Sequence, residues 1–268
     1  MLFLIPLIII SLSEDLFQNI APKFRFFVII FTSLFFLYFS NISLPIVDIP
    51  ILNSILQNNL LNIIFLSICI SILANGMNMI DGTNGLLILV CISQLISISL
   101  LASNIEAWEI LDVSIPMIST MVILLLFNFP FGKIFSGDLG AYFFGFFIGY
   151  LTIYFFGKYN NLLSWNAVLI LFYPVFEVLF TYIRRIKNNL SPFQADFLHL
   201  HSLIFAKLNK KLRSKPNDAN YLSTLILIPF IFLPTLLILN VFEILSLIII
   251  AIIVMTILYL LYYKKFIN

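Results

Sequence analysis

The chain has 268 residues, of which 62% are hydrophobic and 10% are charged, and its formal net charge at pH 7 is +2. Its mean hydropathy of +1.12 implies more apolar surface than one soluble domain can bury, so the composition excludes a soluble globular protein. The apolar runs are continuous and do not alternate, which favours membrane-spanning α-helices over a β-barrel.

Nine apolar segments follow one another along the chain when about 20 residues are allowed for each membrane span. They cover residues 1–12, 26–41, 57–74, 85–102, 112–130, 139–157, 164–183, 219–239 and 243–262. The first is too short to cross a bilayer and lacks the features of a signal peptide, so we expect the remnant of a longer helix or a truncated start. The sequence therefore predicts an all-α, polytopic membrane bundle, a single domain over residues 1–268, with about eight full transmembrane helices and a short N-terminal one.

Lysine and arginine residues are distributed unevenly between the predicted loops. One set of alternate loops contains every basic residue except Lys158, namely Lys23, Arg25, Lys133, Lys264, Lys265 and those of the stretch 184–215. Because basic loops stay on the cytoplasmic side of a membrane, we expect the loop 184–217 and the C-terminus to be cytoplasmic. The basic run is short and lies between membrane spans, so a nucleic-acid partner is not expected.

A polar stretch, NGMNMIDGTNGLL at residues 75–87, interrupts the apolar pattern at the end of one predicted helix. Other polar groups fall at the ends of different helices on the same predicted face: Glu14, Asp15, Gly137, Asp138, Asp196, His199 and His201. Polar and ionisable groups near a bilayer are costly and tend to be functional. Carboxylates that converge at one face indicate a site for Mg²⁺ and phosphate, because Mg²⁺ prefers carboxylates together with substrate phosphate oxygens.

Each of these groups also has a purely structural interpretation. Asp81-Gly82 is a common turn sequence, Asp138 can cap the helix that follows it, and Glu14 and Asp15 can be solvated charges at a helix end. The two histidines can be an exposed pair, and the basic run 207–215 can be a topological anchor or a contact with anionic lipid. Their shared location on one face lowers the odds that all these interpretations hold together.

Four segments resemble, in order and spacing, the motifs of the polyprenyl-phosphate N-acetylhexosamine-1-phosphate transferases of glycosyltransferase family 4, whose superfamily includes phospho-N-acetylmuramoyl-pentapeptide transferase. They are EDLFQNIAPKFR (14–25), the polar stretch with its Asp81-Gly82-Thr83-Asn84-Gly85 core, NFPFGKIFSGDLGAYFFGF (128–146) and RRIKNNLSPFQADFLHLHSL (184–203). The chain departs from the family pattern at five positions: Glu14, Asn84 and Glu177 replace Asp, Phe197 replaces Arg, and Ser202 replaces His. The family's N-terminal helices and their Gly-rich loop have no counterpart, so an incomplete gene product or a misplaced start is expected.

The resemblance implies transfer of an N-acetylhexosamine 1-phosphate from a UDP-sugar to a polyprenyl phosphate, with release of UMP. It would be the first membrane step of cell-envelope polysaccharide synthesis. The lipid would be undecaprenyl phosphate in a bacterial source, and the enzyme would lie in the inner (plasma) membrane with its active site on the cytoplasmic face. The implied cofactor is Mg²⁺, with Mn²⁺ as an alternative, and a homodimer is left open. The HLHS sequence is more similar to the N-acetylhexosamine branch than to the pentapeptide branch.

The residues that match the family motifs receive expected roles from the resemblance. The catalytic set is Glu14, Asp15, Asp81, Asp138, His199 and His201, and Asp138 and Asp81 are the expected metal ligands. The substrate-binding set is Asn75, Asn78, Asn84, Asn128, Phe135, Arg184 and Arg185. Carboxamides can hold sugar or uridine groups without repelling an anionic ligand, and an arginine pair can clamp phosphates, although membrane anchoring is as plausible for it.

Two other interpretations stay open at this point. A membrane transporter also uses Asn, Gly and Asp at broken helices, but it places them near the bilayer midplane and often has internal repeats, which we do not find here. The second is a catalytically inactive, truncated member of the family. Exchange of labelled UMP with a UDP-sugar would separate the enzyme from both.

Overall fold

The computed structural model describes residues 4–192, 196–212 and 216–267, and every regular element within these ranges is a helix. The helices are α1 (Ile5–Phe17), α2 (Pro22–Ser40), α3 (Pro50–Leu56), α4 (Asn59–Ile80), α5 (Leu86–Asn104), α6 (Trp108–Asn128), α7 (Gly137–Lys158), α8 (Trp165–Ile170), α9 (Phe172–Lys187), α10 (Leu200–Leu212), α11 (Pro216–Val241) and α12 (Leu245–Ile267). The predicted all-α polytopic bundle is confirmed.

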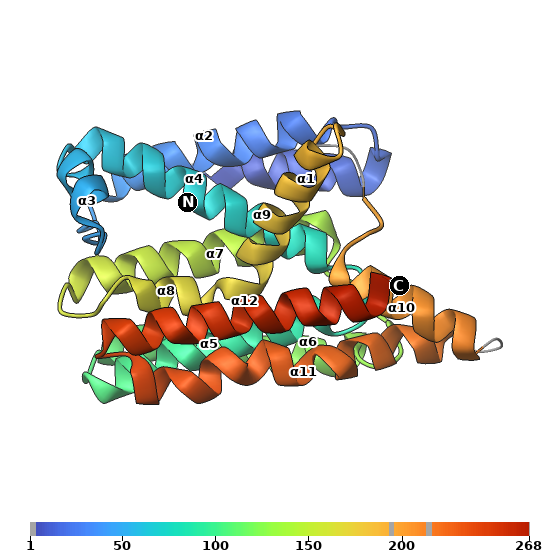
Figure 1. Ribbon diagram of the computed structural model, residues 1–268. Coiled ribbons are helices and arrows are strands. Elements are labelled where there is room, and N and C mark those ends of the chain that lie inside the picture. The colour runs from blue at the N-terminus through green and yellow to red at the C-terminus, as the bar shows by residue number, and fades with distance from the viewer. Residues whose placement is uncertain (1–3, 193–195, 213–215, 268) are drawn as a thin grey trace.

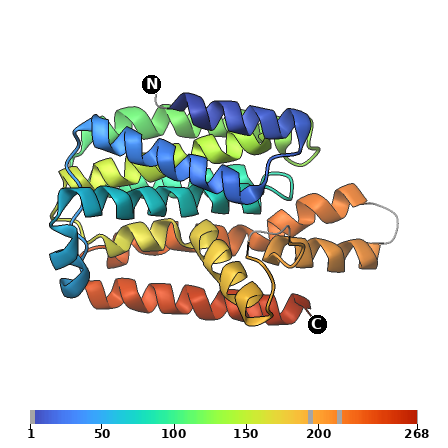
Figure 2. The same ribbon diagram turned by 90° about the horizontal axis from the view of Figure 1, so that it is seen from above.

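Seven of these helices are long and apolar enough to cross a membrane: α2, α4, α5, α6, α7, α11 and α12. They run along one common direction in both views of the bundle (Figure 1, Figure 2). The predicted short first helix is α1, which continues beyond the predicted end to Phe17 and so carries the acidic pair. The first three residues of the predicted segment 1–12 lie outside the described residues.

The seventh predicted segment, residues 164–183, differs from a single helix. It forms α8 and α9, which meet at Leu171, and α9 lies obliquely across the bundle (Figure 1). A proline in a helix removes one backbone hydrogen bond and crowds the carbonyl four residues earlier. For Pro174 that carbonyl belongs to Ile170, the last residue of α8, so the proline accounts for the position of the break.

Close packing of α4 against its neighbours positions the polar end of the molecule. A side chain at Gly145 of α7 would come within 2.5 Å of the Ala74 Cα on α4, so these two backbones approach closely because Gly145 has no side chain. Gly76 of α4 packs in the same way against the backbone of Pro174 in α9. Helix α4 is therefore held between α7 and α9.

The polar motifs gather at one end of the bundle, on the right in Figure 1. Helices α1, α4, α9 and α12 end there, α2, α5 and α7 begin there, and the α10–α11 hairpin extends beyond it (Figure 1). The opposite end carries an ion pair between Glu109 and Lys158, with 2.8 Å between the carboxylate oxygen and Nζ.

Candidate active site

The polar stretch ends α4 and turns the chain into α5. Helix α4 stops at Ile80, Asp81 is its C-terminal flanking residue, and Gly85 adopts a left-handed φ of +81° immediately before α5. The turn is tied to the end of α6, because the backbone N–H of Gly85 donates to Asn128 Oδ1 at 2.5 Å. This connection places Asp81 at the polar end of the bundle.

Asp15, near the end of α1, caps the N-terminus of α7. Its carboxylate oxygens accept the backbone N–H groups of Asp138 at 2.8 Å and Leu139 at 3.1 Å. The first N–H groups of a helix have no partner within the helix, and a carboxylate is favoured there. Gly137 has a φ of +64°, and a Cβ on it would lie 2.9 Å from the Asp15 carboxylate, so glycine permits this approach. Asp138 does not need its own side chain as a cap.

The carboxylate of Asp138 is held by two side chains from other helices. Asn78 of α4 donates from Nδ2 to Oδ1 at 2.8 Å, and Arg25 of α2 forms an ion pair with Oδ2. The same guanidinium group lies 3.4 Å from Glu14, whose other oxygen accepts the N–H of Ile20 at 2.9 Å. Four helices, α1, α2, α4 and α7, thus bring the motifs together around one carboxylate.

Asp81 lies close to this cluster. Burial, together with the nearby charges of Asp138 and Asp15, raises its pKa to about 7. Within the part of the chain that the structure describes, no donor contacts the Asp81 carboxylate. A partly buried carboxylate without a protein donor, under the influence of other carboxylate charges, is suited to a cation or to a substrate hydroxyl.

The two histidines lie beside the α4–α5 turn. Their rings stack with centroids 5.8 Å apart and planes 2° from parallel, and both side chains are buried. A Cβ added at Gly82 would overlap the imidazole of His201, so glycine makes room for this ring. Burial lowers the pKa of His201 to about 4, and the imidazole is therefore neutral at pH 7.

A polar cavity of about 300 Å³ opens between these groups. It lies between α2, α4, α7, α9 and the start of α10, and it is lined by Pro22, Arg25, Asn75, Asn78, Met79, Tyr142, Thr181, Tyr182, Pro192, Asp196, His199, His201 and Ser202. The cavity therefore combines the Asp138 partners on one side with both histidines on the other.

Some predicted substrate-binding residues have other partners. Asn84 donates from Nδ2 to the carbonyl of Pro130 at 2.8 Å, and Asn128 donates to the carbonyl of Ile134 at 2.6 Å, so both hold the loop before α7. Phe135 in that loop is 67% exposed. Their contact with a nucleotide stays a prediction.

The predicted arginine clamp is engaged within the loop that follows α9. Arg184 pairs with Asp196, Arg185 Nη1 lies 3.6 Å from the same carboxylate, and Arg185 also donates from Nε to the carbonyl of Ser191 at 2.6 Å. These bonds shape the loop that leads to the histidines. A role in phosphate binding stays a prediction.

Sequence reasoning overlooked Arg25 as a site residue, although it lies in the first matched motif. A cation ten positions after an acidic pair carries no local signal, because its meeting with Asp138 depends on how α2 packs beside α7. Tyr142 and Tyr182, which line the cavity, lie inside apolar runs and likewise give no signal.

The donor set fits the predicted Mg²⁺. Among the described residues, no group of three or more His, Cys, Asp or Glu side chains could hold a metal by protein ligands alone. Mg²⁺ usually takes one or two carboxylates and completes its shell with waters and substrate phosphates. Asp81, which lacks a protein donor among the described residues, and Asp138 provide two carboxylates whose charges oppose each other, an arrangement that a divalent cation would relieve.

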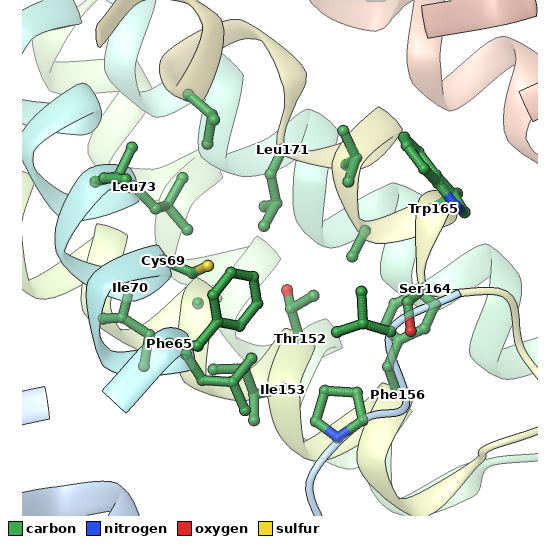
Figure 3. Close-up of a pocket in the computed structure, with 18 of the residues that line it drawn as sticks. Phe65, Cys69, Ile70, Leu73, Thr152, Ile153, Phe156, Ser164, Trp165 and Leu171 are labelled. Carbon is green, nitrogen blue, oxygen red and sulfur yellow. The ribbon is translucent and has the colours of Figure 1, made fainter. Parts of the chain in front are cut away.

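A second, apolar cavity of about 360 Å³ adjoins α4, α7, α8 and α9. Figure 3 shows Phe65, Cys69 and Leu73 of α4, Thr152 and Phe156 of α7, and Leu171 around its open centre. The two cavities follow one another along the same helices. On α4, the apolar cavity is lined by residues between 65 and 73, and the polar cavity by residues between 75 and 79. On α9, residues 175 and 179 line the apolar cavity, and residues 181 and 182 line the polar one.

Seven long apolar helices define a multi-pass membrane protein. The cavity lined by ionisable side chains, where several of these helices end, is its candidate active site. Residues 1–156 match the family model of glycosyl transferase family 4, which is more than half of the chain. The chain belongs to glycosyl transferase family 4.

Individual relatives agree with this assignment. The chain is 32% identical over 137 residues (50% of the chain, 38% of the relative) to a Bacillus subtilis protein named as a probable undecaprenyl-phosphate N-acetylglucosaminyl 1-phosphate transferase. It is 27% identical over 209 residues (78% and 62%) to the undecaprenyl-phosphate alpha-N-acetylglucosaminyl 1-phosphate transferase of Thermotoga maritima. It is 34% identical over 147 residues (54% and 44%) to a Sulfolobus acidocaldarius protein provisionally named a UDP-N-acetylglucosamine–dolichyl-phosphate N-acetylglucosaminephosphotransferase. The chain spans less than two thirds of the length of each of these relatives.

Proposed function

We propose that the protein transfers an N-acetylhexosamine 1-phosphate from a UDP-sugar to a polyprenyl phosphate and releases UMP. The observation that carries this proposal is the pair of consecutive cavities along α4 and α9. One is polar and bordered by ionisable groups, and the other is apolar and lies along membrane-spanning helices. A lipid phosphate is the substrate class that needs both, and the names of the relatives combine a polyprenyl phosphate with an N-acetylglucosamine 1-phosphate.

In the proposed reaction, an oxygen of the polyprenyl phosphate attacks the β-phosphorus of the UDP-sugar. The new bond joins that oxygen to the β-phosphorus, and the bond from the β-phosphorus to the bridging oxygen breaks, so UMP leaves with the electron pair. The products are UMP and a polyprenyl-diphospho-sugar. A reaction of this kind depends mainly on alignment and on neutralising charge.

Asp138 and Asp81 would hold Mg²⁺, which when bound supplies Lewis-acid polarisation of the diphosphate. Arg25 keeps Asp138 oriented and brings positive charge to the wall of the polar cavity. Glu14 and Asp15 act on the site through Arg25 and the start of α7, and Asp15 fixes the backbone of Asp138 itself. The acidic pair is therefore best explained as a positioning device for Asp138, whatever further contact it makes with the lipid phosphate.

The apolar cavity would take the part of the polyprenyl chain next to the phosphate. Its walls are mainly aliphatic and aromatic side chains of α4, α7 and α9, and α9 lies obliquely at its side (Figure 1, Figure 3). A lipid that enters from the bilayer along α9 would bring its phosphate to Asn75, Asn78 and Tyr182. This arrangement matches a substrate that is tethered in the membrane.

The clustering of basic residues at this end supports a cytoplasmic active site in the plasma membrane, since basic loops stay in the cytoplasm. A UDP-sugar donor is also most accessible there. The polymer that the lipid-linked sugar enters would be a cell-envelope polysaccharide. Mn²⁺ is an alternative metal, because it shares the preference of Mg²⁺ for oxygen ligands.

The test is transfer of radiolabel from UDP-N-acetylglucosamine to undecaprenyl phosphate by the reconstituted full chain. The Asp138→Asn variant is assayed under the same conditions. Because Asp138 lies at the centre of the cluster, we expect the substitution to lower turnover by on the order of 100-fold or more while the protein stays membrane-inserted. Glu109→Gln is the matched control, because it also removes an ion-paired carboxylate at a helix end, but at the opposite end of the bundle. Equal activity of Asp138→Asn and Glu109→Gln would contradict the proposed site.

A further inference from the structure

A buried carboxylate lies behind the histidines. Glu177, on α9, has no solvent exposure at all, and its two oxygens receive three donors. Oε1 accepts from His199 Nδ1 at 3.1 Å and from the backbone N–H of Leu200 at 3.2 Å, and Oε2 accepts from the Tyr259 hydroxyl at 2.6 Å. A buried charge is costly unless its bonds are satisfied, so this arrangement is specific.

The contact with His199 determines which edge of the imidazole faces the cavity. With Nδ1 directed at the carboxylate, a neutral ring carries its proton on Nδ1, and Nε2 is the nitrogen available to a ligand. His199 lines the polar cavity, and no described residue bonds its Nε2. The ring is held from a second side by the stacked His201.

Tyr259 fixes the carboxylate in turn. It is on α12, it has no solvent exposure, and its ring packs edge-to-face against Phe176 and Phe180 of α9 with centroids 4.8 Å and 5.3 Å apart. Packing of this kind restricts the position of the hydroxyl. The carboxylate of Glu177 therefore joins three elements: α9, the start of α10 and α12.

We propose that Glu177 is a positioning residue for transfer, which holds the Nδ1–H of His199 so that Nε2 faces the polar cavity, where it donates to a phosphate when the ring is protonated. This inference rests on the proposed function for its catalytic consequence, but the hydrogen bond can be tested without activity. Glu177 acts through His199 and does not contact substrate itself. The same carboxylate also accepts the backbone N–H of Leu200, the first residue of α10. This second bond fixes where α10 begins and so keeps both histidines in place.

The chain has only two histidines, so protein labelled with [15N]histidine and reconstituted in bilayers gives two imidazoles to assign, with His201→Asn identifying the second. We expect solid-state NMR to find the His199 imidazole protonated and hydrogen-bonded at Nδ1. Glu177→Met, which has a similar volume and no acceptor oxygen, is expected to shift the proton toward Nε2. If the Nδ1 signal is absent in the wild type, or unchanged in Glu177→Met, the inference is wrong whether or not the protein transfers sugar phosphate.

Kinetics supplies the second readout. Glu177→Met is expected to lower kcat by on the order of 100-fold and leave KM for the UDP-sugar within about threefold, because a mispositioned general acid–base or donor group is felt mainly in the transition state. Glu177→Asp keeps the charge, and its kcat should be within about tenfold of the wild-type value. Tyr259→Phe is the comparison, since it removes one hydrogen bond from the same carboxylate but leaves the His199 contact, and its kcat should fall by no more than about tenfold. A loss in Tyr259→Phe as large as that in Glu177→Met would identify a merely structural cluster and overturn the proposal.

Discussion

The carboxylate of Asp15 accepts the backbone N–H of Asp138 at 2.8 Å and that of Leu139 at 3.1 Å. An acidic residue of α1 therefore caps α7, the helix that carries Asp138. Two consequences follow from this relationship. The oxygens of Asp15 are occupied by backbone donors, and the direction of the Asp138 side chain is fixed by a residue 123 positions earlier in the chain. The acidic pair and the Gly-Asp segment are therefore one structural unit.

Asp15→Ala tests this unit. It removes both bonds to the first turn of α7, and loss of a helix N-terminal cap typically costs about 1 kcal/mol in the free energy of unfolding. We expect a lower thermal unfolding midpoint in detergent and a turnover reduced by at least about tenfold, because Asp138 loses its fixed backbone. Asp112→Ala is the control, since Asp112 is an exposed carboxylate on α6. Identical midpoints for the two variants would refute the capping role.

Gly82→Ala tests the contact between the α4–α5 turn and His201. The added Cβ would overlap the imidazole, and forcing a side chain into a packed site typically costs 1–3 kcal/mol, so we expect a loss of about that size. In a His201→Ala background the space is open, and the same substitution should cost less than about 0.5 kcal/mol. The measurement is a double-mutant cycle of unfolding free energies. Additive costs would mean that Gly82 and His201 do not touch.

Cys69→Trp tests the apolar cavity as the site of the polyprenyl chain. Cys69 lines this cavity, as Figure 3 shows, and an indole there would fill part of the space that the chain needs. We expect KM to rise by about tenfold for a long polyprenyl phosphate and to change little for a short-chain analogue that does not reach Cys69. Ile68→Trp is the control, because Ile68 is the exposed neighbour on the same helix. Equal effects on long and short lipids would place the chain elsewhere.

The long helices were predictable because continuous apolar runs of about 20 residues leave a membrane-spanning helix as the simplest way to satisfy the backbone. The exception is residues 164–183, which are also mainly apolar but form α8 and α9, with Pro174 in the first turn of α9. The proline was visible in the sequence. The oblique direction of α9 was not, since it depends on packing against Gly76 of α4.

For the site, the sequence predicted that acidic groups from separate helices would meet at one face, and Glu14, Asp15, Asp81 and Asp138 do lie together. It did not predict what each carboxylate bonds. A charge pattern along the chain cannot distinguish a cap for a neighbouring helix, such as Asp15, from a carboxylate that faces a ligand, such as Asp81. Asn84 and Asn128 were expected from the resemblance to bind substrate, and in the structure their amides hold the loop before α7.

The most direct test of the central claim, that this helix-end cluster carries out sugar-phosphate transfer to a lipid, is exchange of labelled UMP into UDP-N-acetylglucosamine by the reconstituted chain. Exchange requires the lipid-linked product to react backwards, so a transporter or an inactive relative cannot catalyse it. We predict exchange that depends on polyprenyl phosphate and on Asp138. Absence of exchange in the wild-type chain, or exchange that persists in Asp138→Asn, would contradict the account.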